Sequence, residues 1–319
     1  MQLNKALIIL VFIVLTTGLY AQQAPMFSQN MFTYTSINPG SYAINDAICA
    51  TGIMRQQWAG FQDQDGINVA PQTFLVSASA PLEFLKGGIG VNIVKDKLGF
   101  FSDVTASVGY AYKLNFWQGV LGVGASINML NRKIDFTKFK PTQGGDPILD
   151  NAIETSDLMM DFSLGLFYNV PNQYYVGISI ANLTESKGNT FNANTTAATQ
   201  TDRIVYLVGG YEFLFPRNPL LKFNPSILIK SDFASTQISL SGLLTYNNKF
   251  WGGVTYNVQT ADAFAILLGL RFNDLKIGYA YDLPLSSINS KGSHEIMLSY
   301  CFNLSIKKKK DSYRNTRFL

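Results

Sequence analysis

Few side chains of this sequence could do covalent or metal chemistry. The chain has 1 histidine, His294, and 2 cysteines, and no residues stand at metal-ligand or phosphate-loop spacing. The glycines of Gly87-Gly88-Ile89-Gly90 are an incomplete dinucleotide fingerprint and fall within a strand pattern. We therefore expect no enzymatic activity and no cofactor.

Charged residues within otherwise apolar stretches are a second set of side chains that could do chemistry. Such residues pair with one another or bind a polar substrate. They are Arg55, Glu212, Lys222, Lys230, Lys276, Asp282 and Glu295. They are widely separated in the sequence, so either role requires elements that bring them to one side of a common wall.

An alternation of apolar residues with small or polar ones predicts these elements. The run Leu275-Lys276-Ile277-Gly278-Tyr279-Ala280-Tyr281-Asp282 is typical of it. A period of two suits strands with lipid on one face and a wet lumen on the other. The pattern recurs over residues 47–304, which predicts an all-β fold, a transmembrane antiparallel β-barrel of the outer-membrane type.

The pattern divides into about fourteen candidate strands, an even number, as closed bacterial barrels have. Their ranges are 47–58, 71–80, 88–96, 101–114, 119–131, 159–169, 174–183, 203–214, 219–231, 236–246, 249–258, 262–272, 274–282 and 292–304. Connections after even-numbered strands are short and the others are mostly long and polar, which predicts short periplasmic turns and longer extracellular loops. Tyr112, Tyr246 and Phe272 stand beside short turns on the lipid-facing phase, as interfacial aromatics do. A soluble β-sandwich, whose half-buried strands also alternate, is the alternative.

The first residues indicate export. Lys5, an apolar stretch over residues 6–15 and small residues up to Ala21 are typical of a cleaved signal peptide, residues 1–21. A membrane anchor is the alternative, but the stretch is shorter than the roughly 20 residues that a spanning helix needs. We expect a multi-pass outer-membrane protein. The net charge of +4 is too small to indicate nucleic-acid binding.

Two segments lie outside the predicted barrel of residues 47–304. Residues 22–46 include Phe27-Ser28-Gln29-Asn30-Met31-Phe32, whose apolar side chains favour a plug inside the lumen over a lead-in across the periplasmic mouth. Residues 305–319 form a basic periplasmic tail. Its lysines, Lys307, Lys308, Lys309 and Lys310, either grip anionic headgroups or an acidic partner, or are simply solvated.

The strand phase directs one set of side chains into the lumen. It includes the charged residues Arg55, Glu212, Lys222, Lys276 and Glu295, for which mutual pairing is favoured over substrate binding. Many of their inward neighbours are small. Small inward residues indicate a channel or a plugged cavity, or they relieve crowding at a curved wall.

Three further residues have a predicted structural role. Cys49 and Cys301 fall in the first and last strands, which are neighbours in a closed barrel, so they form a disulfide or remain two buried thiols. Pro225 removes a ladder hydrogen bond from a lipid-facing position, so we expect a bulge or kink there. That site is either an opening where a partner docks or a tolerated irregularity. Topology makes Pro225, Trp251 and the four tail lysines the candidate partner contacts.

Particular segments carry a resemblance over essentially the whole chain after residue 21. They include Pro25-Met26-Phe27-Ser28-Gln29-Asn30-Met31-Phe32, Asn38-Pro39-Gly40-Ser41-Tyr42-Ala43, Arg55-Gln56-Gln57-Trp58-Ala59-Gly60-Phe61, Asn248-Lys249-Phe250-Trp251-Gly252-Gly253-Val254 and Gly292-Ser293-His294-Glu295-Ile296-Met297-Leu298-Ser299-Tyr300. In order and spacing these segments resemble the PorP/SprF family of Bacteroidetes. The departure is Gly40, where the family more often has alanine after Asn-Pro.

The resemblance implies an outer-membrane component of the type IX secretion system. Such a component supports secretion or surface attachment of cargo proteins and, in gliding species, of large adhesins. The implied partners are the secreted cargo or adhesin, the translocon, periplasmic ring components and outer-membrane lipid. We expect docking of these partners to be the mechanism. A passive or lipid-transporting channel is the alternative, and a purely structural barrel is the third interpretation.

Overall fold

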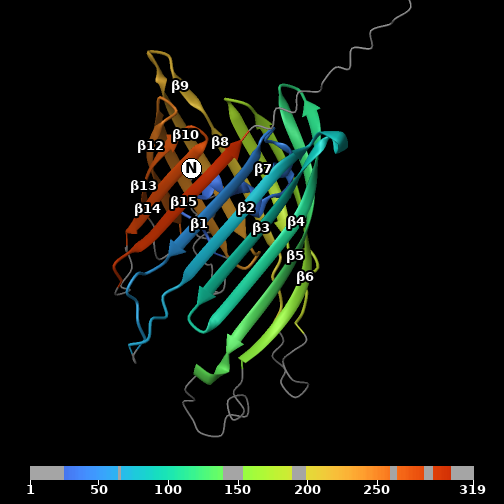
Figure 1. Ribbon diagram of the computed structural model, residues 1–319, viewed down its shortest axis with the longest axis vertical. Coiled ribbons are helices and arrows are strands. Elements are labelled where there is room, and N and C mark those ends of the chain that lie inside the picture. Colours follow the sequence, from blue (N-terminus) through green and yellow to red (C-terminus); the bar gives the residue numbers. More distant parts are fainter. Residues whose placement is uncertain are drawn as a thin grey trace, which may run out of the picture.

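The computed structural model describes residues 25–63, 66–138, 154–188, 199–258, 264–283 and 290–302. Most of them lie in long strands that wrap into one cylinder (Figure 1). In chain order the strands are β1 (Ile48–Gln56), β2 (Gln72–Leu82), β3 (Gly87–Leu98), β4 (Phe101–Phe116), β5 (Gly119–Asp135), β6 (Glu154–Val170), β7 (Tyr174–Ala181), β8 (Ile204–Tyr211), β9 (Phe213–Phe215), β10 (Asn218–Ser231), β11 (Thr236–Tyr246), β12 (Phe250–Val258), β13 (Phe264–Phe272), β14 (Leu275–Leu283) and β15 (Ser293–Phe302). The predicted signal peptide and basic tail, residues 1–21 and 305–319, lie outside the described residues.

The sheet closes on itself. The strands pair antiparallel in chain order, except that β8 and β9 both pair with β10, and β15 returns to pair with β1. Since the sheet closes into a ring, the wall can lie in lipid. This closure excludes the soluble β-sandwich, and the fold is the predicted outer-membrane β-barrel.

Two of the labelled strands occupy one position in the wall. β8 and β9 both pair with β10, and the register is the same on the two sides of Glu212, with Ser226 opposite Gly210 and Phe223 opposite Phe213. The interruption of the ladder spans Asn224 and Pro225 of β10, which lie opposite Glu212 and Tyr211, and Pro225 has no N–H to donate. Counted this way the described wall has fourteen strands, as the sequence predicted. The ladder is interrupted at Pro225 but no residue is inserted there, so the expected irregularity is a gap rather than a bulge.

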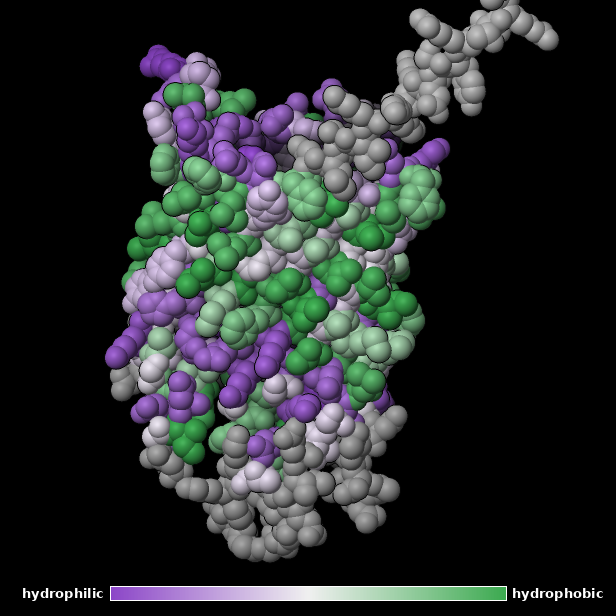
Figure 2. Space-filling view, viewed as in Figure 1, coloured by the Kyte–Doolittle hydropathy of each residue, from purple (hydrophilic) through white to green (hydrophobic). Residues whose placement is uncertain are grey.

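The two faces of the wall differ as the alternation requires. On β4, Val104, Val108 and Leu114 are exposed on the outer face, and Ala111 is fully buried on the inner one. Figure 2 shows green apolar side chains covering the middle of the barrel, with purple polar ones at its upper end and over part of its lower half. The apolar outer surface is therefore a lipid-facing belt.

The two ends of the barrel also differ. Short turns join β4 to β5, β6 to β7, β9 to β10, β11 to β12 and β13 to β14 at the upper end in Figure 1; we call this the short-turn end. Asn247, Asn248 and Asn273 have positive φ in two of these turns, a conformation that asparagine tolerates. Tyr246, Phe250 and Phe272 are exposed beside them. In outer-membrane barrels this end faces the periplasm.

Several strands are longer than the sequence predicted. β5 and β6 have 17 residues each, whereas about 9–11 residues cross the bilayer. The extra residues lie at the end opposite the short turns, where Arg132 of β5 forms an ion pair with Asp103 of β4 at 2.7 Å. With these polar pairs, the hairpins extend beyond the apolar belt. The alternation of lipid-facing and lumen-facing residues alone could not indicate this extension.

In the described residues, the helices are short, with three to five residues each. η1 (Asn30–Phe32), α2 (Tyr34–Ile37) and η2 (Pro39–Ala43) precede β1, η3 (Glu83–Leu85) joins β2 to β3, and η4 (Phe136–Lys138) follows β5. Within the described ranges, no helix is long and apolar enough to cross a membrane.

A disulfide joins the two ends of the barrel wall. Cys49 and Cys301 stand directly opposite each other across the β1–β15 seam, their Cα atoms are 4.1 Å apart, and the sulfur atoms are bonded. The bond links positions 252 residues apart in sequence, so it holds nearly the whole barrel in one covalent ring.

Replacing both cysteines, Cys49→Ser together with Cys301→Ser, should lower the free energy of unfolding by about 2–4 kcal/mol, because the unfolded chain is no longer a closed ring. Urea unfolding of the folded barrel in detergent measures this. On a non-reducing gel the unfolded wild-type chain should migrate faster than the same chain after reduction. Alkylation of two thiols per chain in unreduced, denatured protein would contradict the disulfide.

Candidate functional site

The chain before β1 lies inside the barrel. We call residues 25–43 the inner segment; it comprises η1, α2 and η2 and the residues that lead into them. Its side chains contact inward residues from both halves of the wall, from β1 and β2 to β15. The apolar residues that suggested a plug are thus covered by the barrel interior, and they do not lie across its mouth.

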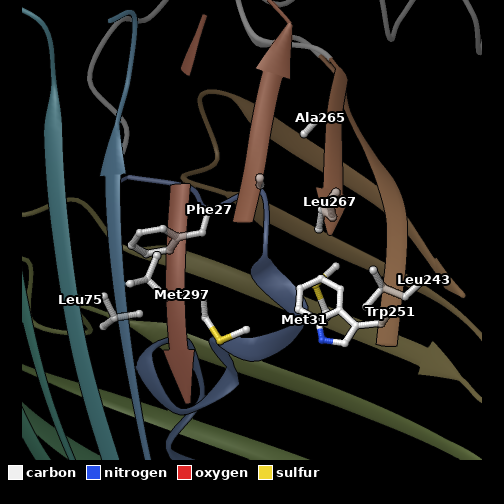
Figure 3. Close-up of a cluster of buried hydrophobic side chains, with 10 residues drawn as sticks. Phe27, Met31, Leu75, Leu243, Trp251, Ala265, Leu267 and Met297 are labelled. Atoms are coloured by element: carbon white, nitrogen blue, oxygen red, sulfur yellow. The ribbon is translucent and has the colours of Figure 1, made fainter. Parts of the chain in front are cut away.

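One half of the inner segment packs in an apolar cluster. Phe27 and Met31 are buried against inward side chains of β1, β2 and β11–β15, as Figure 3 shows. Phe32 lies against Trp251, with ring centroids 5.2 Å apart. The wall residues of the cluster are Ile53, Leu75, Leu243, Trp251, Ala265, Leu267, Ala280 and Met297. Apolar residues in a lumen are buried only if something apolar fills it, and here the inner segment does so.

Buried charges hold the same part of the inner segment by its backbone. Arg55 pairs with Asp282 at 2.5 Å and with Glu295 at 3.2 Å, and both carboxylates have no exposed surface. Glu295 also accepts hydrogen bonds from the backbone N–H groups of Ser28 and Gln29, each at 2.9 Å. A carboxylate with a guanidinium and two N–H donors is well compensated, which is what a buried charge requires.

The hydroxyl of Ser28 completes this cluster. It donates to Asp282 at 2.7 Å and accepts from Arg55 at 2.8 Å. The Ser28 carbonyl accepts from the Thr255 hydroxyl on β12 at 2.9 Å. Ser28 is therefore held by three separate parts of the wall, namely β1, β12 and the β14–β15 pair.

The other half of the inner segment lies against a glycine-rich part of the wall. A Cβ atom added to Gly122 would lie 1.9 Å from the carbonyl oxygen of Gly40, and one added to Gly124 would lie 2.4 Å from Pro39. Gly88, Gly90 and Gly165 meet Asn38 or Tyr42 in the same way. The small inward residues thus leave space for the inner segment to lie close to the wall, in agreement with the plugged-cavity interpretation of the sequence.

Asn38 and Tyr42 anchor this second half. The Asn38 amide donates to the carbonyls of Leu166 at 3.0 Å and Ile178 at 3.2 Å, and its oxygen accepts from the N–H of Gly40. The Tyr42 hydroxyl accepts from the Asn92 side chain at 2.9 Å. Burial raises the pKa of Tyr42 to about 12, so its hydroxyl stays neutral.

The structure divides the predicted lumen charges between two places. Arg55 and Glu295 join Asp282 in the cluster around Ser28, whereas Glu212 pairs with Lys222 at 2.9 Å near the short-turn end. Lys276 lies over the Phe32 ring, with Nζ 5.8 Å from the centroid. Lys230 is also buried but belongs to neither group.

The residues predicted to contact partners have different locations. Trp251 points into the barrel and is 8% exposed, so its described contacts are with the inner segment and the wall. Pro225 stands at the ladder gap between β8, β9 and β10. Lys307, Lys308, Lys309 and Lys310 lie outside the described residues.

A cavity of about 310 Å³ brings several of these residues together at the short-turn end. The inner segment forms one side of it through Met31, Phe32 and Tyr34, and turn residues such as Gln173 and Asn248 form its rim. The earlier candidates Glu212, Lys222, Pro225, Trp251 and Lys276 all line it. The cavity presents aromatic rings, amides and cations together, which suits noncovalent binding. Among the described residues no cluster of histidine, cysteine, aspartate and glutamate could hold a metal ion.

Sequence reasoning missed Ser28 and Asn38 as anchors. The register that places Cys49 opposite Cys301 also places Arg55 opposite Glu295. Because an antiparallel pair has a single register, that ion pair could have been deduced from the disulfide. Nothing in the alternation of the strands indicates Ser28 or Asn38, since both lie outside it.

Comparison with protein families and solved structures agrees with this architecture. A family model described as "Type IX secretion system membrane protein PorP/SprF" matches residues 19–300. A search of curated proteins finds no match to the chain.

Solved outer-membrane barrels share the fold at low sequence identity. The toluene transporter TbuX of Ralstonia pickettii is 12% identical with a TM-score of 0.50, over 85% of this chain and 93% of that one. A FadL homologue of Pseudomonas aeruginosa is 13% identical with a TM-score of 0.46, over 85% of this chain and 94% of that one. Omp33 of Acinetobacter baumannii is 9% identical with a TM-score of 0.44, over 81% and 98%. These similarities concern the barrel alone.

Glu295→Ala should destabilise the barrel by about 3–5 kcal/mol, because it leaves Arg55 short of a counter-charge and two backbone N–H groups without an acceptor. Hydrogen exchange of the Ser28 and Gln29 amides should speed up in the same variant. The matched control is Asp103→Ala, which breaks the partly exposed pair with Arg132 far from the inner segment and should cost about 1 kcal/mol or less. Equal losses in the two variants would contradict the role of Glu295.

Deleting residues 25–43 should open the lumen. The expected result is a rise in single-channel conductance in planar bilayers over the wild-type protein, because the inner segment fills the interior. A control protein in which a Gly/Ser sequence of equal length replaces the segment should also conduct. Heat-modifiable gel mobility establishes that both variants are folded; a folded deletion variant that conducts no better than wild type would refute the plug.

Proposed function

The chain belongs to the PorP/SprF family of type IX secretion system membrane proteins, and we propose that it supports secretion or surface attachment of cargo proteins by docking them to the outer membrane. The docked protein is a secreted cargo or a large adhesin. On the other side of the membrane the barrel contacts the translocon or periplasmic ring components. The protein acts as an anchor and carries out no reaction of its own.

The filled lumen is the observation that supports docking over transport. A channel needs a continuous water-filled path, whereas the inner segment here packs against the wall from β1 to β15. It does so through an apolar cluster and through a cluster of hydrogen-bonded buried charges, both of which are costly to open. A passive or lipid-transporting channel would require the inner segment to leave.

The long outer hairpins and the short-turn end offer two separate docking surfaces. β4, β5 and β6 extend beyond the belt on the side opposite the short turns, and they present polar pairs such as Arg132 with Asp103. The short-turn end carries the cavity. We assign cargo to the extended hairpins and periplasmic components to the short-turn end.

The proposed function also includes residues 1–21, residues 305–319 and the lipid around the barrel. Residues 1–21 direct export and are removed, and residues 305–319 form a basic tail in the periplasm. The tail lysines, Lys307 to Lys310, hold anionic lipid headgroups or an acidic partner. Outer-membrane lipid surrounds the apolar belt.

Affinity capture of the tagged protein from native outer membranes in mild detergent tests the docking function. A large secreted protein or type IX components should remain bound and be identified by mass spectrometry. An unrelated outer-membrane barrel with the same tag, taken from the same strain, is the control and should recover neither. A clean monomeric barrel that conducts ions in bilayers would overturn docking in favour of a channel.

The tail can be tested in the same experiment. Removal of residues 305–319 should reduce capture of a periplasmic partner and make the remaining capture less sensitive to salt, since exposed charges are screened within about 8–10 Å at physiological ionic strength. Unchanged capture and salt dependence would show that the lysines are solvated and carry no partner.

A further inference from the structure

Two cations face each other at the short-turn end without a counter-charge. Arg271 on β13 stands directly opposite Lys276 on β14, and both line the cavity. Like charges directly opposite across a sheet are destabilising. Within the described part of the chain neither has an acidic partner at ion-pair distance; Arg271 donates through Nε to the Asn273 carbonyl at 2.8 Å, and Lys276 lies over Phe32. An anion between them would relieve this repulsion.

A buried donor without an acceptor adjoins this pair. Trp251 is 8% exposed and lines the cavity, and its Nε1 has no hydrogen-bond partner. A buried N–H left unpaired costs about 1–3 kcal/mol. The same donor would be satisfied by an oxygen of a bound molecule.

The wall is shaped to hold the Trp251 ring. Gly269 stands opposite Trp251, and Gly269 in turn faces Gly278. A Cβ atom at Gly269 would lie 2.0 Å from the indole, and one at Gly278 would lie 2.7 Å from it. Only glycines let the ring lie flat across these strands. Since Arg271 and Lys276 are two residues further along the same faces, the cations lie next to the ring on its short-turn side.

The rest of the cavity suits an amphipathic ligand. Met31, Phe32 and Leu243 offer apolar contacts, while Asn224, Thr245 and Asn248 offer hydrogen bonds. The nearby Glu212 is already paired with Lys222, so it does not neutralise Arg271 or Lys276. The cavity therefore combines a cationic end, a fixed aromatic ring and amide partners.

We propose that this cavity binds a peptide carboxylate that has an aromatic or aliphatic side chain beside it. Arg271 and Lys276 hold the carboxylate, Trp251 donates to one of its oxygens, and the side chain packs against Phe32 and the indole. The carboxylate is either the C-terminus of a protein or an acidic side chain. This assignment rests on the docking function for the source of the peptide, which comes from a periplasmic partner.

A peptide fits this position better than a lipid. Arg271, Lys276 and Trp251 share the lumen-facing phase of their strands, whereas lipid covers the opposite face. The rim is formed by turns at the short-turn end, including Asn172, Gln173 and Asn248. A segment entering from the periplasm reaches the cavity without crossing the wall.

Binding of small probes to the purified full-length protein tests the site. Calorimetry with N-acetylphenylalanine at low salt should detect binding, and N-acetylphenylalaninamide, which lacks the charge, should bind at least tenfold more weakly. Acetyl-Asp-Phe-amide, with a side-chain carboxylate and a blocked end, distinguishes the two sources: tighter binding of one probe identifies that source. Arg271→Gln and Lys276→Gln should each weaken binding at least tenfold.

Two further variants test the contribution of the indole N–H and the specificity for cations that line the cavity. Trp251→Phe retains a ring but removes the N–H, and should weaken binding about 2- to 12-fold. Lys249→Gln removes an exposed cation at the same end that does not line the cavity, and should bind as wild type does. Heat-modifiable mobility establishes folding of each variant.

Three outcomes would overturn the proposal. The first is equal binding of N-acetylphenylalanine and its amide, and the second is wild-type affinity in folded Arg271→Gln and Lys276→Gln. The third is displacement of the peptide probe by dihexanoylphosphatidic acid at a tenfold lower concentration than that of the probe, which would assign the site to lipid phosphate. If the wild-type protein binds the probes but captures no partner from native outer membranes, the docking function is refuted and the carboxylate site is not.

Discussion

The buried carboxylate of Glu295 is the interaction on which the interior of this barrel depends. It has no exposed surface, and it meets the Arg55 guanidinium and the backbone N–H groups of Ser28 and Gln29 together. A buried charge that loses such partners costs several kcal/mol, so the cluster is stable only when the inner segment is in place. Wall and inner segment are consequently two parts of one core. The fold of residues 25–43 and that of β15 are coupled through this single group.

The geometry of a fourteen-stranded wall explains why such a core is needed. As strand number rises the interior widens, and wall side chains alone no longer fill it. One solution is a water-filled channel; this chain instead returns its own N-terminal residues into the lumen. Glycines at positions 122 and 124 make room for the backbone of η2, and apolar residues of β11–β15 cover Phe27 and Met31. The lipid-facing surface is unaffected, because the strand period separates the two faces.

The same arrangement shapes what the protein can do. With the lumen occupied, the accessible polar surfaces are the extended outer hairpins and the short-turn end, where the remaining cavity is bounded by Phe32 and Tyr34 of the inner segment. A barrel of this kind is a fixed platform with two faces, as the proposed docking function requires. The inner segment thus contributes both to the core of the barrel and to the lining of this cavity.

The sequence by itself determined the wall of this protein. A period of two set which side chains face lipid, connection lengths set which end carries short turns, and the position of two cysteines in the first and last strands indicated the seam. Pro225 indicated an irregularity in its own strand, because proline cannot donate to a ladder, but it did not indicate that the neighbouring strand is split at Glu212. Apart from Arg55 and Glu295, whose pairing follows from the register of the disulfide, tertiary structure decided which lumen charges meet. Arg55 lies with Asp282, Glu295 and Ser28, while Glu212 pairs with Lys222 and Lys276 lies over Phe32. These contacts join residues up to 267 positions apart through the lumen. They depend on the register of every intervening strand and on the path of the inner segment, which has no strand period of its own. A local sequence pattern indicates neither the register nor that path.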